Sequence, residues 1–166
     1  MEGIWYYQPF DSPVGRLYLL AKEEHLHAIA FESNWPRIRA ALTLRQEQDT
    51  PVLQMTREQL KEYFAGDRHT FELPLQLQGT PFQQQTWQAL MAIPYGETRT
   101  YSEQAKALGK PLAVRAVGHA NSLNPLSIIV PCHRVVAKSG YLTGYAGGLH
   151  AKRFLLELEG VQGPLL

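Results

Sequence analysis

The sequence predicts an α+β protein with a small N-terminal domain built on an antiparallel sheet and a helical C-terminal domain that contains a helix-turn-helix. Three observations lead to this prediction. Closely spaced aromatic and aliphatic runs fill the first third of the 166-residue chain. Two Thr-Pro dipeptides then mark the starts of helices. Further on, two short helical segments are separated by a turn that contains glycine.

The N-terminal part is expected to begin as an antiparallel meander. Strand-prone runs lie at residues 4–7, 17–20 and 25–31, and residues 11–15 have the composition of a turn. Connections this short favour antiparallel pairing of neighbouring strands. Residues 35–44 are expected to be helical.

The next helix has clear start and stop signals. Thr50-Pro51 supplies a hydroxyl cap with proline in the first turn, and Gly66 can end the helix. A polar, irregular stretch over 67–79 follows, with a strand-like triplet at 71–73. We therefore place a supporting domain at 1–75 and a second domain at 79–166.

The second domain is expected to be helical. Thr80-Pro81 repeats the capping signature, and 94–96 stops that helix. Helices are then predicted at 101–108, 112–122 and 149–159, the first two joined by Gly109-Lys110-Pro111. This spacing fits a helix-turn-helix, although an ordinary αα-hairpin has the same pattern.

Composition narrows the function classes. Hydrophobic residues make up 45% of the chain, as in globular proteins, and no apolar run is long enough to span a membrane. No secretory leader is visible, and the single cysteine permits neither an internal disulfide nor a cysteine-rich zinc site. A cytoplasmic location is therefore expected. Residues 1–75 carry a net charge of −3 and residues 76–166 one of +4, which either places a phosphate-binding surface in the second half or is ordinary variation.

Cys132 is the candidate nucleophile. It follows the apolar run Ile128-Ile129-Val130 and Pro131, so it lies where the chain leaves the core. His133 can take the thiol proton, directly or through water, and Arg134 adds positive charge. The alternative is that Cys132 is a small buried hydrophobe.

Three further features accompany the cysteine. Asn124, before Pro125, can brace a loop through its amide. The segment 140–148 is a glycine-rich loop entering a helix, without the lysine of a phosphate-binding P-loop. Glu159 ends the last helix, where a carboxylate opposes the helix dipole, which suggests a partner such as histidine or a solvated side chain.

Together these residues resemble the O6-alkylguanine-DNA alkyltransferase family. The resemblance covers residues 79–160 and rests on a series of motifs in the right order and spacing: Gly79-Thr80-Pro81-Phe82-Gln83, Ile93-Pro94-Tyr95-Gly96, Tyr101, Arg115-Ala116-Val117-Gly118, Asn124-Pro125, Pro131-Cys132-His133-Arg134-Val135, Gly144-Tyr145-Ala146-Gly147-Gly148 and Glu157-Leu158-Glu159-Gly160. The first 75 residues resemble the family in their predicted elements and in Tyr63-Phe64-Ala65-Gly66. The resemblance implies a ribonuclease H-like N-terminal domain.

The resemblance also implies catalytic roles. Cys132 would accept the alkyl group, His133 would draw its proton through water, and Glu159 would orient His133. Asn124 would brace the turn that carries the cysteine. Tyr101 would assist rotation of the nucleotide and donate a proton to guanine N3.

The implied DNA-binding set is Arg115, Tyr101, Ala116, Gly118, Asn121 and Arg134, and the implied substrate pocket is Val135, Tyr145, Ala146 and Gly147. Arg115 would fill the gap left by a flipped nucleotide, and helix 112–122 would lie in the minor groove. Backbone at Cys132, Val135 and Ala146 would read the guanine edge.

The expected function is direct-reversal repair of O6-alkylguanine, and of O4-alkylthymine, in double-stranded DNA, by a single-turnover monomer. No cofactor, no metal and no membrane are expected as partners. Two alternatives remain open from the sequence: a non-catalytic protein that binds alkylated lesions, and a cysteine hydrolase using Cys132 and His133, for which no oxyanion-hole motif is visible.

Overall fold

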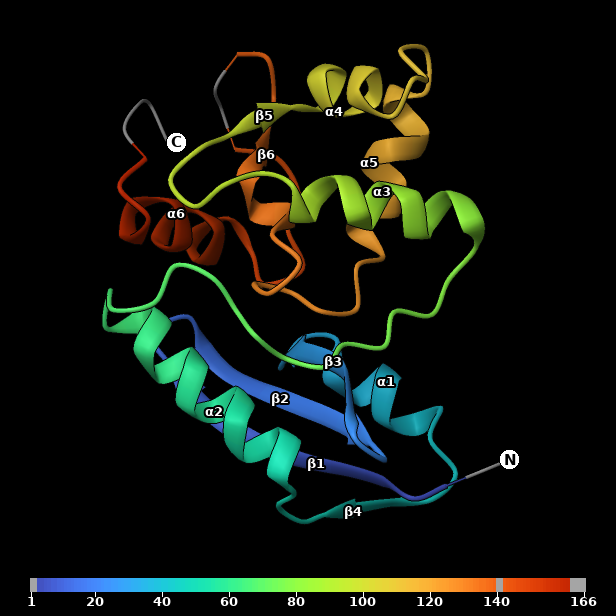
Figure 1. Cartoon of the computed structure of the whole chain (residues 1–166), viewed down its shortest axis with the longest axis vertical. Coiled ribbons are helices and arrows are strands. Elements are labelled where there is room, and N and C mark those ends of the chain that lie inside the picture. Colours follow the sequence, from blue (N-terminus) through green and yellow to red (C-terminus); the bar gives the residue numbers. More distant parts are fainter. Residues whose placement is uncertain (1–2, 140–141, 162–166) are drawn as a thin grey trace. The chain divides into compact units, whose positions relative to one another are not determined.

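A computed structural model describes residues 3–139 and 142–161 of the chain (Figure 1). Contacts between Cα atoms divide the chain into two compact units, Met1–Leu77 and Gln78–Leu166. The first unit contains a four-stranded sheet with two helices, and the second contains mainly helices. Gly140 and Tyr141, which begin the glycine-rich segment, lie outside the described residues.

The sheet of the first unit contains the expected meander. Strands β1 (Trp5–Ser12), β2 (Gly15–Lys22) and β3 (His25–Phe31) pair antiparallel in sequence order. A fourth strand, β4 (Arg45–Glu47), pairs parallel to β1 at the sheet edge, so the sheet is mixed. The sequence analysis did not find β4, because all three of its residues are exposed and show no hydrophobic alternation.

A helix covers each face of this sheet. Helix α1 (Trp35–Ala40), shorter than the predicted 35–44, places Trp35 against Tyr18, with their rings stacked at 4.9 Å. Helix α2 (Pro51–Phe64) covers the opposite face, where Phe10 contacts Phe64. Alternating side chains along β2 therefore reach two separate apolar layers.

The segment after α2 has no strand at the predicted 71–73. The buried amide of Gln59 donates to the Glu72 carbonyl at 3.0 Å and accepts from the Glu72 N–H at 2.9 Å. A side chain thus takes the place of a neighbouring strand in satisfying this backbone. An isolated parallel bridge joins Leu26 and Leu75.

The second unit is helical, as expected. Its elements are α3 (Pro81–Met91), β5 (Arg99–Thr100), α4 (Tyr101–Ala107), α5 (Val114–Ser122), a 3-10 turn η1 (Cys132–Arg134), β6 (Val135–Val136) and α6 (Leu149–Leu158). Capping boxes at Thr80 and Thr100 fix the starts of α3 and α4. The α4–α5 pair is the helix-turn-helix, and Gly109 adopts φ +72° in its turn.

Two contacts hold α5 in place. The indole N–H of Trp87 on α3 donates to the Ala120 carbonyl at 2.9 Å. The side-chain amides of Gln104 on α4 and Asn121 on α5 bond reciprocally at 2.9 and 2.8 Å. Both amides are buried and satisfy each other, which fixes the angle between the two helices.

A short parallel strand pair brings the start of α4 next to the segment that carries Cys132. Strand β5 pairs with β6, with Arg99 opposite Val135 and Thr100 opposite Val136. Because β5 leads directly into Tyr101 and β6 follows directly after η1, the start of α4 lies beside the loop that carries Cys132. Within the described residues, no helix is both long and apolar enough to cross a membrane.

Candidate active site

Cys132 stands at the end of a buried and strained loop. Residues 126–131 are buried, while Cys132 itself is partly exposed. Ile128, which is 1% exposed, has φ +76°, a left-handed conformation that a β-branched residue rarely adopts. Such strain persists only where surrounding contacts enforce it, and it occurs often at functional sites.

Asn124 is one of those contacts. Its amide nitrogen donates to the Val130 carbonyl at 2.8 Å and to Sγ of Cys132 at 3.3 Å. Its amide oxygen accepts from the N–H of Leu126 at 2.9 Å. One buried side chain therefore closes the loop and also supplies a hydrogen bond to the sulfur, which favours the thiolate.

His133 forms a buried pair with Glu159. Nε2 of His133 lies 2.8 Å from Oε2 of Glu159, and both side chains are fully buried. Burial alone would raise the pKa of Glu159, but hydrogen bonds from His133 and from the Arg134 guanidinium hold that pKa well below its usual range. An ionised carboxylate only accepts, so Nε2 carries the proton and Nδ1 has the lone pair.

The pKa shifts of His133 and Cys132 suit a neutral base beside a protonated thiol. Burial lowers the pKa of His133, against the opposing effect of Glu159, so the imidazole is neutral at neutral pH. Burial also raises the pKa of the Cys132 thiol, against the smaller effects of Asn124 and Lys152. Nδ1 of His133 is buried and has no hydrogen-bond partner among the described residues. It is free to accept a proton.

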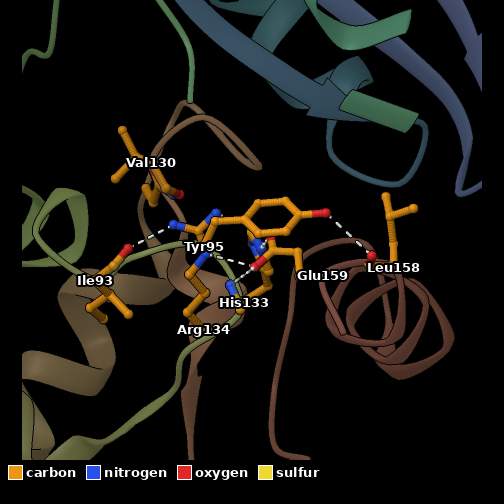
Figure 2. Close-up of polar contacts among 9 residues, drawn as sticks. Ile93, Tyr95, Val130, His133, Arg134, Leu158 and Glu159 are labelled. Carbon is orange, nitrogen blue, oxygen red and sulfur yellow. Dashed lines mark hydrogen bonds and ion pairs between the residues drawn. The ribbon is translucent and has the colours of Figure 1, made fainter. Parts of the chain in front are cut away.

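Arg134 points into the protein, where its guanidinium is bonded to other residues of the chain, although it was expected in the DNA-binding set. Its Nε and Nη2 donate to Glu159 at 2.8 and 3.1 Å, and its Nη1 donates to the Ile93 carbonyl at 2.7 Å (Figure 2). The ring of Tyr95 lies 5.8 Å from the guanidinium, and its hydroxyl donates to the Leu158 carbonyl at 3.3 Å. Only 7% of Arg134 is exposed, and its observed contacts are with Glu159, Ile93 and Tyr95.

A cavity of about 400 Å³ opens in front of the sulfur. Its lining includes Tyr101, Gly118, Asn124, Cys132, Tyr145 and Ala146. The expected pocket residues Val135 and Gly147 are not part of this lining, and Val135 is fully buried. The structure thus brings Tyr101, Tyr145 and Ala146 to one cavity with the thiol.

Helix α5 presents a polar face beside this cavity. Arg115, Ala116, His119 and Ser122 are exposed, whereas Val117 is buried. Asn121 was also expected on the DNA-binding surface, but it is only 7% exposed and its amide is occupied by Gln104. Its observed role is to join α4 to α5, although it borders the cavity.

Comparison with known proteins agrees with this geometry. Residues 81–161 match the model of the 6-O-methylguanine DNA methyltransferase DNA-binding domain, and residues 5–77 match that of its ribonuclease-like domain. The chain belongs to the 6-O-methylguanine DNA methyltransferase family. It is 47% identical over 156 residues to the constitutive methylated-DNA–protein-cysteine methyltransferase of Bacillus subtilis, covering 93% of this chain and 94% of the relative. A Methanosarcina acetivorans methylated-DNA–protein-cysteine methyltransferase is also 47% identical, over 93% of this chain and 98% of its own length.

Solved structures of the family have the same fold. The O6-methylguanine methyltransferase of Mycobacterium tuberculosis superposes with a TM-score of 0.86 at 44% identity, over 97% of this chain and 96% of that one. A structure of Mycobacterium tuberculosis OGT in complex with DNA gives a TM-score of 0.84 at 45% identity, over 93% of this chain and 92% of that one.

The sequence analysis of this family member missed two residues at the site, Lys152 and Thr143. Lys152 is 1% exposed, and its ammonium donates to the Thr143 carbonyl at 2.9 Å. Thr143 lines the cavity, and its hydroxyl lies 3.0 Å from that of Tyr101. The sequence did indicate that Lys152 is buried, because helical spacing of i, i+3, i+4 and i+7 places it on the same face as Leu155, Leu156 and Glu159.

Proposed function

We propose that this protein repairs DNA by direct reversal of base alkylation. It transfers an alkyl group irreversibly from O6 of guanine in double-stranded DNA to Sγ of its own Cys132. The observation that carries the proposal is the position of the Cys132 thiol, which faces a cavity on a loop braced by Asn124 and adjoins the neutral, carboxylate-oriented His133. The proposal is also supported by relatives that are named for this transfer and share the family and the fold of this chain.

The transfer starts with movement of a proton. Nδ1 of His133 accepts the thiol proton of Cys132, through water, and the imidazolium that forms is stabilised by Glu159. The thiolate attacks the alkyl carbon, the S–C bond forms and the C–O6 bond breaks. The electron pair leaves with guanine, and the phenol of Tyr101 donates a proton to guanine N3. The proton held by His133 is then released to solvent, and the Tyr101 phenolate takes one from solvent. No water releases the alkyl group, so each molecule acts once.

DNA recognition is assigned to the exposed face of α5. Arg115 enters the base stack where the damaged nucleotide is flipped out, and the helix lies in the minor groove. Gly118 supports this assignment, because an added Cβ would be 3.8 Å from the Tyr101 ring, an ordinary contact. The fold does not need glycine there, whereas a closely approaching DNA strand does.

The remaining expectations complete the proposal. Residues 79–166 form the alkyltransferase domain and residues 1–75 a supporting domain. O4-alkylthymine in DNA is a second substrate, and the protein works as a monomer in the cytoplasm without a cofactor.

The test is intact-protein mass after mixing with a short duplex that contains O6-methylguanine, with Cys132→Ala as the control. The wild type is expected to gain one methyl group per chain and then stop, while the variant gains none. Tight lesion binding without a mass gain would identify a non-catalytic lesion-binding protein. Repeated turnover on excess DNA would contradict the single-use mechanism.

A further inference from the structure

Thr143 forms a hydrogen bond that the proposed transfer has not yet used. Its hydroxyl lies 3.0 Å from the hydroxyl of Tyr101, which is 42 residues away in the chain. Both side chains line the cavity in front of the Cys132 thiol. The phenol that is proposed to protonate guanine therefore already has a hydroxyl partner in the free protein.

The fold anchors both residues independently of this bond. The backbone carbonyl of Thr143 accepts from the buried ammonium of Lys152 at 2.9 Å. Tyr101 opens helix α4, which packs against α5. Its ring lies 3.8 Å from the point where a Cβ on Gly118 of α5 would stand. The bond between Thr143 and Tyr101 therefore joins two segments that other contacts already hold in place.

Resting on the proposed alkyl transfer, we propose that Thr143 is a positioning residue of that reaction. Its hydroxyl orients the Tyr101 phenol toward guanine N3 and stabilises the phenolate that is left when the proton moves.

The direction of this hydrogen bond follows from the protons that the two hydroxyls carry. In the free protein either hydroxyl can donate to the other. A tyrosine hydroxyl has a single proton, and in the proposed transfer this proton goes to guanine N3. The bond between Tyr101 and Thr143 can then persist only with Thr143 as the donor. Donation by Thr143 thus leaves the phenol proton for the base.

The same hydrogen bond becomes stronger as the proton moves. The Tyr101 oxygen gains negative charge when its proton passes to N3, and hydrogen bonds to an ionised oxygen are roughly twice as strong as those to a neutral one. An interaction that is stronger in the transition state than in the ground state accelerates the step. The Thr143 hydroxyl is exposed in the free protein, whereas a duplex over the cavity would exclude the water that could replace it.

The first test compares Thr143→Val with Thr143→Ser in single-turnover methyl transfer from a duplex that contains O6-methylguanine. Valine keeps the shape of threonine without its hydroxyl, whereas serine keeps the hydroxyl. Thr143→Val is expected to transfer about tenfold more slowly than wild type, a smaller loss than for a buried donor to an oxyanion. Thr143→Ser should restore the rate, and the affinity of both variants for the duplex should match wild type.

A second substrate separates support of the acid from a change in cavity shape. O6-methyl-3-deazaguanine has a carbon in place of N3 and cannot accept the phenol proton. Wild type and Thr143→Val are therefore expected to take methyl from it at equal rates. In a Tyr101→Phe background, Thr143→Val should likewise have no further effect. A defect of Thr143→Val that persists in either case would overturn the inference.

Modification of Cys132 by iodoacetamide without DNA controls for the nucleophile. Its rate is expected to be equal in wild type and Thr143→Val, and a changed rate would place the effect on the thiol and overturn the inference. An unchanged rate of methyl transfer from O6-methylguanine by Thr143→Val would also overturn it. Failure of wild type to take methyl from DNA would instead refute the proposed function, since each comparison starts from a wild type that transfers.

Discussion

Replacing Glu159 by glutamine tests the buried charge cluster. Glu159 accepts hydrogen bonds from His133, from two nitrogens of Arg134 and, at 3.3 Å, from the backbone N–H of Gly96. Glutamine keeps the shape but removes the negative charge, and its amide nitrogen has to face some of these donors. Arg134 then remains a buried cation without its counter-ion.

The expected loss is large because both partners are buried. Removing one partner of a buried ion pair lowers the free energy of unfolding by about 3–5 kcal/mol. Because glutamine keeps one oxygen that can still accept a hydrogen bond, we expect Glu159→Gln to lose about 3 kcal/mol. The pKa of Glu159 is depressed in the folded state, so its contribution is fully present above its unfolded pKa and is lost as pH falls below it. Between pH 4.5 and pH 3 the advantage of wild type should shrink by about 2 kcal/mol, at 1.36 kcal/mol per pH unit.

The rate of methyl transfer should fall as well as the stability. If the glutamine amide donates to Nε2 of His133, the imidazole proton moves to Nδ1, which then cannot accept the proton of Cys132. Loss of a general base typically slows a reaction at least about a hundredfold. The methyl-transfer rate of Glu159→Gln, measured where the variant is folded, is expected to drop by at least that factor.

Urea unfolding at pH 7 and pH 3 and single-turnover transfer assays measure these effects. Glu157→Gln is the matched control, because Glu157 lies on the same helix but pairs with Arg153 at 3.5 Å on the exposed surface. It should change stability by less than about 0.5 kcal/mol. A loss below about 1 kcal/mol for Glu159→Gln, or one independent of pH, would refute the argument.

Three further predictions concern the same unit. Asn124→Ala removes the hydrogen bonds to Val130, Leu126 and Cys132. It should lower the free energy of unfolding in urea by about 2–3 kcal/mol and raise the pKa of the Cys132 thiol. A wild-type pH dependence of Cys132 modification by iodoacetamide would contradict this. S-methylation of Cys132 places a methyl group beside Asn124 and weakens the hydrogen bond from the Asn124 amide to the sulfur, so it should lower the melting temperature; an unchanged or higher value would count against it. Gly118→Ala should stabilise α5 by up to about 1 kcal/mol but weaken DNA binding. An unchanged affinity for DNA would show that this face of α5 does not contact DNA.

Locally encoded features of the fold could be predicted from the sequence. Thr50-Pro51 and Thr80-Pro81 act within one helical turn, and both threonines cap their helices as expected. The meander was predictable because its strands neighbour one another in sequence. Strand β4 was not, because an exposed edge of three residues depends on its pairing with β1 rather than on its own pattern.

The candidate site could also be predicted only in part. Asn124, Cys132 and Glu159 could be named as candidates from the sequence motifs that contain them. The direction of Arg134 was not predictable, because its partners Ile93 and Glu159 are 41 and 25 residues away and only the fold brings them to it. The resemblance placed Arg134 in the DNA-binding set, whereas its guanidinium bonds to the carboxylate of Glu159 in the structure.

The energetically unfavourable features of this unit lie on and around the segment that carries Cys132. Ile128 has a left-handed backbone conformation, and Glu159 and Arg134 form an ion pair that is withdrawn from water. Lys152 is a buried cation that forms no ion pair with a carboxylate among residues 3–139 and 142–161. Each opposes stability taken alone, and local rules are usually broken where function requires it. A catalyst that turns over must also return to its starting state, but a protein that acts once has no such requirement. Its site can therefore be arranged wholly for forming one thiolate.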